Sequence, residues 1–480
     1  MQRNDLVKVN EYLWEVPKSH WDKMNVPARI YADEKLLEKV FDDRGMQQLV
    51  NVATLPGIQK YSLAMPDIHE GYGFPIGGVA AFDLEEGVVS PGGVGYDINC
   101  GVRMLRSKVL YENVKDQILP LVNQIQRDVP SGLGSRHREK LSGAELEKIL
   151  KHGARELVRR GIGDQNDLEH CEEGGEMKNA DPEKVSERAK SRGKDGLGTL
   201  GSGNHFLEIQ RIEKIFDEGT AEAFGLFLGQ VTVMIHCGSR GLGHQIASDY
   251  IRDFLKQALK NNIKLVDREL VWAPIKSAEG QNYLAAMAAG ANYAWANRHT
   301  IAHNIRLAWK RILGNAGGNL ELVYDVAHNI AKFEKHNMNS IEKEVCVHRK
   351  GATRAFDPGR EELHKDYQHI GQPVIIPGTM GTASYVLVGT DEAMKQTFGS
   401  VSHGAGRVMS RGQAIRSVSF EKLQSEIKKK NIIVRTGHKK GLLEEAPIAY
   451  KDIDNVVNVV SGAGLARKVA RLRPLGVVKG

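Results

Sequence analysis

The stretch SPGGVGYDINCGVR, residues 90–103, places Asp97 and Cys100 three positions apart in a loop flanked by glycines. Glycine permits positive φ angles and lets the backbone approach a ligand closely. A carboxylate oxygen and a thiolate sulfur from this loop could therefore face one cation. The alternative is a buried structural cysteine beside an aspartate that caps the loop. Further ligands from elsewhere in the chain would favour the metal site.

Three histidines stand where predicted strands end. His205 lies in GSGNHFLE, His236 ends the apolar run VTVMI, and His328 ends LVYDVA. One such histidine is more often a surface or hydrogen-bonded residue, but three together favour metal binding. With Asp97 and Cys100 they offer five donors, more than one tetrahedral zinc ion takes. Because a thiolate can bridge two cations, we predict a binuclear site. These ligand types accept manganese, zinc, cobalt or iron.

His403 lies in VSHGAGRVMSR, residues 401–411. Gly404 and Gly406 could expose backbone amides to a phosphate, and Arg407 could neutralise its charge. A neutral imidazole can attack phosphorus, so the motif predicts a nucleophile, with a turn carrying an incidental histidine as the alternative. The sequence has no GxxxxGK[ST] phosphate loop and no KxDG motif of lysine-adenylylating ligases, so nucleotide chemistry would need another nucleophile.

Composition sets broad limits on the class of protein. The chain has 480 residues, of which 41% are hydrophobic, enough for one large domain or two fused ones. It lacks the run of about 18 apolar residues that a membrane span needs and the apolar block of a secretory signal, so we expect a cytoplasmic protein. Its four cysteines form no CxxC pair. The net charge of +7 is weak support for a polyanionic partner.

Hydrophobic periodicity predicts helices over residues 112–128, 143–160, 243–260 and 278–313, with Gly290 as a bend or a close-packing point of the last. Strand-like runs occur near residues 231, 320, 344 and 373. The pattern predicts an α+β fold. Residues 170–194, charged and glycine-containing, are expected to be an insertion or a mobile loop.

Taken together, the motifs resemble the RtcB family of RNA-splicing ligases. The resemblance runs from about residue 65 to the terminal Lys479-Gly480. The segments that carry it, in order, are MPDIHEGYGFPIGG, GGVGYDINCGVR, GSGNHFLE, HCGSRGLGH, EGQNYLAAMAAGANYAWANR, DVAHN, HRKGATRAF, PGTMGTASY and SHGAGR. It implies a single RtcB-like catalytic domain over residues 1–480, with mixed β-sheets surrounded by helices and a central binuclear metal site.

The resemblance implies that the five ligands hold two Mn²⁺ ions, with Cys100 bridging them, and that His403 attacks the α-phosphate of GTP and carries GMP. Asn204 would contact the phosphate. Guanine would be recognised by Glu208, Ser384, Tyr450 and Lys479. The other residues implied to form the GTP site are His205, Phe206, His328, Asn329, Pro377, Gly378, Thr379, Met380, Gly404, Ala405 and Gly406.

The implied reaction joins an RNA 2′,3′-cyclic phosphate or 3′-phosphate end to a 5′-hydroxyl end through an RNA-3′-pp-5′-G intermediate. The implied substrates are tRNA exon halves, with RNA repair as a further role and an archease-type activating protein as a candidate partner. Arg240, Lys350, Arg407 and Arg411 are candidates for the RNA backbone, although each could be a solvated charge, Lys350 above all. Two alternatives stay open: a metal-dependent phosphodiesterase or phosphatase, and a non-catalytic RNA-binding protein.

Overall fold

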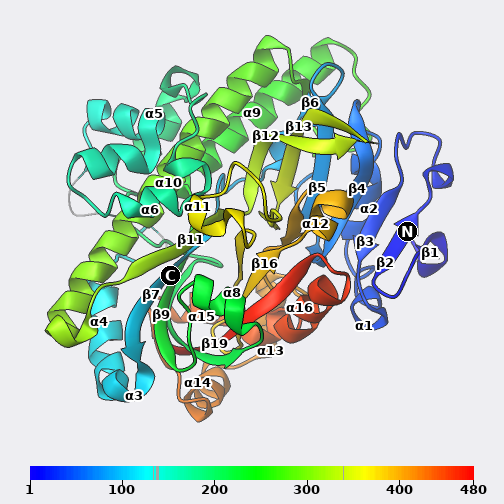
Figure 1. The fold of residues 1–480 in the computed structure, drawn as a ribbon. Coiled ribbons are helices and arrows are strands. Elements are labelled where there is room, and N and C mark those ends of the chain that lie inside the picture. The colour runs from blue at the N-terminus through cyan, green and yellow to red at the C-terminus, as the bar shows by residue number, and fades with distance from the viewer. Residues whose placement is uncertain (133, 137–139, 339) are drawn as a thin grey trace.

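Two mixed β-sheets surrounded by helices form the fold, as Figure 1 shows. The structure is a computed structural model that describes residues 1–132, 134–136, 140–338 and 340–480. The predicted α+β class is confirmed. The four strand-like runs of the sequence correspond to β9, β11, β13 and β15, whose bounds are given below.

One sheet contains seven strands among the described residues and is antiparallel except for the parallel pair β3 and β4. Its strands, in spatial order, are β1 (Val7–Lys8), β2 (Leu13–Val16), β3 (Ala28–Tyr31), β4 (Ile58–His69), β5 (Ile76–Asp83), β13 (Ile341–Lys350) and β12 (Asn329–Met338). Two small pairs flank the large sheets: β6 (Val88–Val89) with β10 (Ala273–Pro274), and β14 (Ala352–Arg354) with β17 (Ser400–Ser402).

The second sheet is the one that carries the candidate site. Its strands in the described residues are β11 (Glu321–Ala327), β7 (Gly101–Leu110), β9 (Gln230–Cys237), β8 (Phe206–Ile215), β19 (Ala466–Lys479), β16 (Ser384–Gly389), β15 (Pro373–Ile376) and β18 (Ile433–Thr436), the last parallel to β19. Val233 and Ile235 face one hydrophobic cluster, and Met234 between them faces another. Both faces are covered, which explains why β9 is an unbroken apolar run.

The helices cover the sheets on several sides. Their bounds are α1 (Glu34–Leu37), α2 (Gly45–Val52), α3 (Tyr111–Val114), α4 (Ile118–Asp128), α5 (Gly143–Arg159), α6 (Asn166–Glu169), α7 (Glu187–Gly193), α8 (Glu218–Ala223), α9 (Arg240–Lys260), α10 (Ala278–Leu313), α11 (Lys365–Gln368), α12 (Asp391–Thr397), α13 (Arg411–Ser417), α14 (Phe420–Lys429), α15 (Lys439–Glu444) and α16 (Ile453–Gly462). Among the described residues, no helix combines the length and apolar character needed to cross a membrane.

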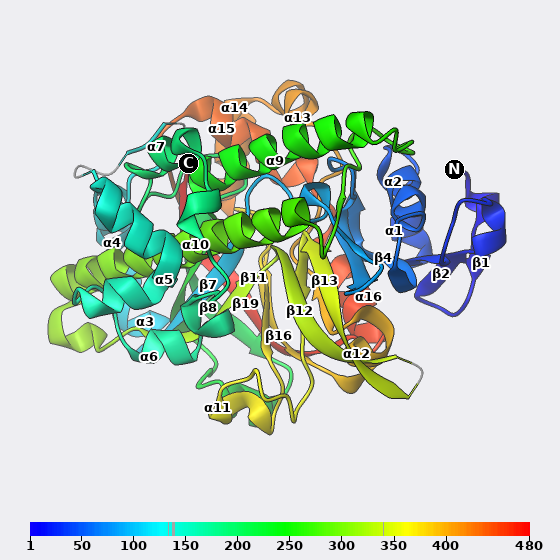
Figure 2. The same cartoon turned by 90° about the horizontal axis from the view of Figure 1, so that it is seen from above.

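The long helix α10 runs beside α9 across one side of the molecule, as Figure 2 shows from above. Its bounds are those predicted, and its alanine-rich middle turns are buried on all sides. A Cβ atom on Gly290 would stand 3.3 Å from side-chain carbons of both Ile98 and Ile246. Gly290 is therefore a close-packing point and not a bend. It seats α10 against Ile98, two residues before Cys100.

Two other predictions need correction. The helix predicted over 112–128 is interrupted, because Val114 leaves the helical region at φ −133° and a 3-10 turn separates α3 from α4. The segment 170–194, predicted to be an insertion or a mobile loop, contains regular structure and a buried ion pair. It contains α7 and the buried Glu172, whose carboxylate lies 2.6 Å from the ammonium of Lys332. One of its charges, Glu172, is thus paired inside the protein, which composition alone did not reveal.

We expect Gly290→Leu to destabilise the fold by about 1–3 kcal/mol, because the added side chain must displace Ile98 and Ile246. The measurement is the urea unfolding midpoint. Gly143→Leu is the matched control, since nothing lies within 4 Å of a Cβ at that position. Equal losses in the two variants would contradict the close-packing role.

Candidate metal centre and nucleotide pocket

Four adjacent strands of the second sheet bring the predicted ligands to one edge. Cys100 immediately precedes β7, His205 precedes β8, His236 lies near the end of β9, and His328 follows β11. The antiparallel register pairs Gly101 with Ala327 and with Cys237, and Phe206 with His236. Two strand starts and two strand ends therefore meet. His205 stands at a strand start, which corrects the prediction that it ends a strand.

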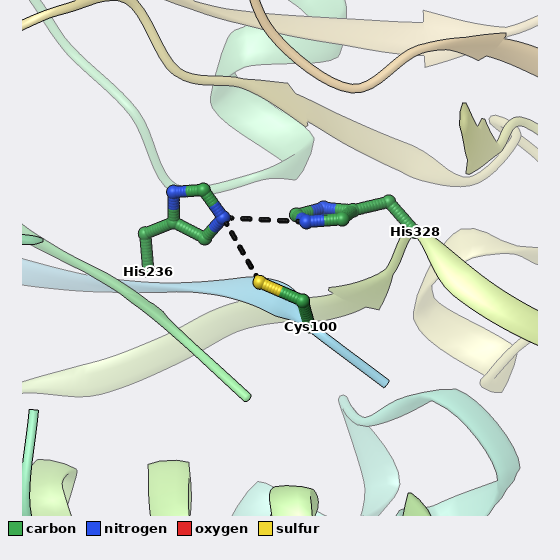
Figure 3. Close-up of side chains that lie close together, drawn as sticks. All are labelled: Cys100, His236 and His328. Atoms are coloured by element: carbon green, nitrogen blue, oxygen red, sulfur yellow. Dashed lines mark hydrogen bonds between the residues drawn. The ribbon is translucent and has the colours of Figure 1, made fainter. Parts of the chain in front are cut away.

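The five predicted ligands converge in two groups that share Cys100. Its Sγ lies 3.3 Å from His236 Nε2, which is 3.2 Å from His328 Nε2, as Figure 3 shows. On the other side, Cys100 Sγ lies 3.5 Å from His205 Nε2, which is 2.8 Å from Asp97 Oδ2. Within each group the donor atoms lie within 4.8 Å of one another. This is the arrangement that a thiolate bridging two cations requires.

Electrostatics at the cluster fit a divalent metal. Burial, with the charge of Asp97, raises the pKa of the Cys100 thiol to about 12. Burial, with neighbouring imidazolium charge, lowers the pKa values of His236 and His328 well below the usual range, so both rings are neutral and offer lone pairs. For Asp97, burial raises the pKa but attraction to His205 outweighs it, and the pKa is lowered. A cation would satisfy these lone pairs and displace the thiol proton.

A buried ion network holds the backbone on which the ligands stand. Arg298 in α10 donates to the carbonyls of Asn99 (2.7 Å) and Cys237 (2.9 Å), the neighbours of two ligands. Its guanidinium is paired with Asp325 at 2.7 Å, and Arg103 donates to the same carboxylate at 2.7 Å. All three charged side chains are fully buried. The network fixes the positions of Cys100 and His236 without touching them.

The strand pair β14 and β17 carries His403 to the metal cluster. The amides of Gly351 and Ala352 donate to the carbonyl of His328, at 2.7 and 3.2 Å, and Ala352 pairs with Ser402. The ring centroids of His403 and His328 are 4.8 Å apart. His403 therefore lies beside the metal-ligand cluster.

Asp67 in β4 orients His403, a contact that sequence reasoning missed. Its Oδ2 lies 2.6 Å from His403 Nδ1 and also accepts the amides of His403 and Gly404 at 3.1 and 3.3 Å. Burial raises the pKa of Asp67, but the attraction of His403 and Lys451 outweighs this and lowers it. The carboxylate therefore keeps the proton of His403 on Nδ1 and leaves the Nε2 lone pair free. The only sequence signal for this role is the position of Asp67 in the motif MPDIHEGYGFPIGG.

A cavity of about 1330 Å³ opens beside the cluster and contains most of the predicted GTP residues. The predicted residues that line it are Asn204, His205, Phe206, His328, Asn329, Pro377, Gly378, Thr379, Met380, His403, Gly404, Ala405, Gly406, Tyr450 and Lys479. A volume above that of a typical small-ligand pocket leaves room for a nucleotide and a second substrate.

Glu208 and Ser384 are buried and are not among the residues that line the cavity. Gln210 Nε2 donates to both, at 2.7 Å to Glu208 Oε2 and at 3.1 Å to Ser384 Oγ. Glu208 Oε1 has no hydrogen-bond partner among the described residues. Burial raises the pKa of this carboxyl to about 8, so it is largely protonated at neutral pH.

Glu445, which the sequence analysis did not name, links several residues that line the cavity. It accepts hydrogen bonds from Tyr450 and from Arg407, the latter at 3.2 Å, and lies 3.9 Å from Lys479 Nζ. Lys479 Nζ also lies 5.6 Å from the ring centroid of Phe206. The buried carboxylate of Glu445 thus contacts Arg407, Tyr450 and Lys479. No local sequence signal marks it.

The four candidate RNA-binding residues all line this cavity but differ in exposure. Arg411 is exposed, whereas Arg407 is engaged by Glu445 and by Tyr450 at 3.0 Å. Arg240 Nε donates to Thr199 at 3.2 Å. Lys350 is buried, its ammonium donating to the carbonyls of Tyr72 (2.7 Å) and Phe74 (2.9 Å). The interpretation of Lys350 as a solvated charge is therefore wrong.

The family model and the most similar relatives reported below all carry the same name. The family model "tRNA-splicing ligase RtcB" matches residues 48–480. Proteins named tRNA-splicing ligase RtcB from Archaeoglobus fulgidus and Thermococcus kodakarensis are 55% and 53% identical to this chain, each over 99% of both chains. One from Pyrobaculum aerophilum is 52% identical over 100% of both. Residues 1–47, which precede the family match, include strands β1 to β3 of the seven-stranded sheet.

We expect Asp325→Asn to lower the free energy of unfolding by about 3–5 kcal/mol, because it removes the carboxylate paired with buried Arg298 and the nearer of the two paired with buried Arg103. Bound metal should also fall, since Arg298 would no longer hold the backbone beside Cys100 and His236. Urea unfolding and elemental analysis measure the two effects. Asp253→Ala, which breaks an exposed pair with Arg252, is the control and should cost less than about 1 kcal/mol. Unchanged stability in the Asp325 variant would refute the bracing role.

Proposed function

Because the chain belongs to the tRNA-splicing ligase RtcB family, we propose that it is an RNA ligase of tRNA splicing that uses GTP and two Mn²⁺ ions. The observation that carries the proposal is the position of His403, whose ring lies against the metal-ligand group while Asp67 holds its other nitrogen. A phosphodiesterase would need the metal ligands but not an oriented imidazole with a free Nε2.

Asp97, Cys100 and His205 would hold one cation, and Cys100, His236 and His328 the other. The two cations would neutralise charge on phosphate oxygens during in-line displacement at phosphorus. The protein contributes fixed ligand positions and a Cys100 side chain shared by both groups. The buried surroundings strengthen each electrostatic interaction.

His403 would act as the nucleophile toward GTP. Its Nε2 lone pair forms a bond to the α-phosphorus while the bond to the bridging oxygen of the β-phosphate breaks, releasing pyrophosphate. The proton on Nδ1 stays with the imidazole, and Asp67 stabilises the positive charge that the ring acquires. The product is a guanylyl group covalently held on His403.

The guanine contacts are proposed on the side of the cavity formed by β8, β16 and β19. Glu208, once ionised, can accept from guanine N1–H and N2–H, and the ammonium of Lys479 can donate to O6. Ser384 and Tyr450 would complete recognition of the base, and Asn204 would contact the phosphate. Glu445 positions Tyr450 and Lys479 for this role. The other cavity residues would form the walls around the nucleotide.

With RNA, a 2′,3′-cyclic phosphate is first opened to a 3′-phosphate. The guanylyl group then passes from His403 to that phosphate, making RNA-3′-pp-5′-G, and the 5′-hydroxyl of the second RNA attacks and expels GMP. Arg240, Lys350, Arg407 and Arg411 are proposed to face the RNA backbone. We further propose tRNA exon halves as substrates, RNA repair as a second role, an archease-type activating protein as partner, and the cytoplasm as the place of action.

The test is incubation of the purified protein with GTP labelled at the α-phosphate and Mn²⁺. We expect acid-labile, alkali-stable label on the protein, because a phosphoramidate has this stability, and we expect His403→Ala to abolish it. The matched control is His369→Ala, at an exposed position away from the cavity, which should keep the label. Hydrolysis of RNA 2′,3′-cyclic phosphate without protein labelling would instead favour the phosphodiesterase. RNA binding with neither activity would favour a non-catalytic protein.

We also expect GTP binding to strengthen as pH rises from about 6.5 to 8. Glu208, with its pKa raised to about 8 by burial, must lose a proton to accept from guanine. If only the ionised form binds, the affinity should be about tenfold weaker at pH 6.5 than at pH 8. Equilibrium binding to His403→Ala protein measures this without guanylylation, and adding Glu208→Gln should flatten the profile.

The raised pKa of Glu208 also predicts how the stability of the protein depends on pH. A raised folded-state pKa means that the protonated form is favoured on folding, so its contribution is full below about pH 4.5 and is lost as pH rises through about 8. The stability of Glu208→Gln relative to the parent protein should therefore be higher at pH 9 than at pH 5. A pH-independent difference in stability would contradict the protonated state of Glu208.

A further inference from the structure

A second group of metal-ligand side chains lies outside the cavity. His170 follows α6, while His364 and Asp366 stand at the start of α11, far along the chain. Both short helices lie at the periphery of the molecule in Figure 2, and none of the three residues lines the cavity of the central site. The reaction proposed above makes no use of them.

The three side chains converge on one point. Asp366 Oδ2 lies 3.2 Å from His170 Nε2 and 3.4 Å from His364 Nδ1, and the two imidazole centroids are 4.8 Å apart. A tetrahedral ion with bonds of about 2.05 Å separates its ligand atoms by about 3.3 Å. The carboxylate-to-imidazole spacings found here match that edge length. They are also compatible with hydrogen bonds, so spacing alone does not separate a metal from a proton.

When the two rings are neutral, the hydrogen bonds on the opposite ring nitrogens decide their tautomers. His170 Nδ1 lies 3.1 Å from the carbonyl oxygen of Asn166, which can only accept, so the proton is on Nδ1 and the lone pair on Nε2. His364 Nε2 lies 3.2 Å from Glu169 Oε2, which places its proton there and its lone pair on Nδ1. The amide of Asp366 donates to this Nδ1 at a long 3.4 Å, consistent with the same tautomer.

The His170 lone pair therefore faces the Asp366 carboxylate, and the His364 lone pair, which accepts the long amide hydrogen bond of Asp366, lies 3.4 Å from the same carboxylate. The carboxylate is itself an acceptor. Metal-binding histidines in proteins commonly have a carbonyl or carboxylate on the second nitrogen, as both do here. We propose that His170 Nε2, His364 Nδ1 and Asp366 Oδ2 form a second metal site for a divalent transition ion of the Zn²⁺ class, with water as the fourth ligand. Two imidazoles and one carboxylate suit Zn²⁺ better than Mg²⁺ or Ca²⁺, which prefer oxygen.

An ion at this site would tie the end of α6 to the start of α11. The carbonyl of His170 accepts the amide of Asp325 at 3.0 Å, so the site stands at the outer end of the network that braces the central ligands. Its role is structural: an ion bound only by the folded chain stabilises it. The half-buried histidines and the exposed carboxylate leave the site open to exchange with solvent.

The test is Zn²⁺ binding by the full-length protein in equilibrium dialysis at pH 7.5. We expect His170→Gln/His364→Gln to bind one ion fewer per chain than the parent protein, and Asp366→Asn to weaken the same ion at least tenfold. The matched control is His20→Gln/His369→Gln, which removes two histidines outside any donor triplet of the described residues and should bind as the parent does. Thermal unfolding with and without Zn²⁺ should show a smaller metal-dependent rise in Tm for the first variant than for the control.

Co²⁺ spectroscopy keeps this site separate from the central one. A thiolate-to-cobalt absorption band reports Cys100, because the second site has no sulfur ligand, and it should be unchanged in His170→Gln/His364→Gln. Cys100→Ala should lose the band yet keep the ion at the second site. Metal binding at each site is therefore measured independently of the other. Equal Zn²⁺ binding by the histidine double variant, by Asp366→Asn and by the parent protein would overturn the proposal and assign the cluster to proton-mediated hydrogen bonds.

Discussion

The buried carboxylate of Asp325 is the constraint on which the centre of this protein depends. It lies in β11 and pairs with Arg103 of β7 and Arg298 of α10, all fully buried. Removing three charges from water is costly, and only close, multiply hydrogen-bonded geometry offsets that cost. The same geometry makes the network stiff. Arg298 extends it to the backbone beside Cys100 and His236, so the stiffness reaches the ligands themselves.

The site arises from the way strands end. Neighbouring antiparallel strands place the start of one beside the end of the next, so ligands distant in sequence meet at one edge of the second sheet. His328 stands where the chain leaves this sheet for the first one, through β12. Its carbonyl accepts the amides that lead into β14, and β14 pairs with the strand before His403. The nucleophile is thereby fixed to a metal ligand through the backbone, which is less deformable than a side-chain contact.

The two candidate metal clusters differ in how their donor atoms are kept available for a cation. In the central cluster burial keeps the imidazoles of His236 and His328 neutral and the Cys100 thiol protonated, so a bound cation would have to displace the thiol proton. The proposed surface cluster has no thiol and is half-exposed, and its tautomers are chosen by one carbonyl and one carboxylate on the outer ring nitrogens. Asp67 selects the tautomer of His403 in the same manner. In each case the partner of the second nitrogen decides what the first can do.

The sequence by itself determined the α+β class, the bounds of α5 and α10 and the residue types of the site, because apolar periodicity and local motifs are properties of neighbouring residues. His205, His236 and His403 could be named because each stands beside a glycine-rich loop, and His328 because it ends a predicted strand. Only the tertiary structure decided which groups touch: the orienting contact of Asp67, the place of the buried Glu445 and the pairing of Glu172 with Lys332. Those contacts join segments up to hundreds of residues apart. The local sequence pattern does not predict strand register or which buried charges form pairs.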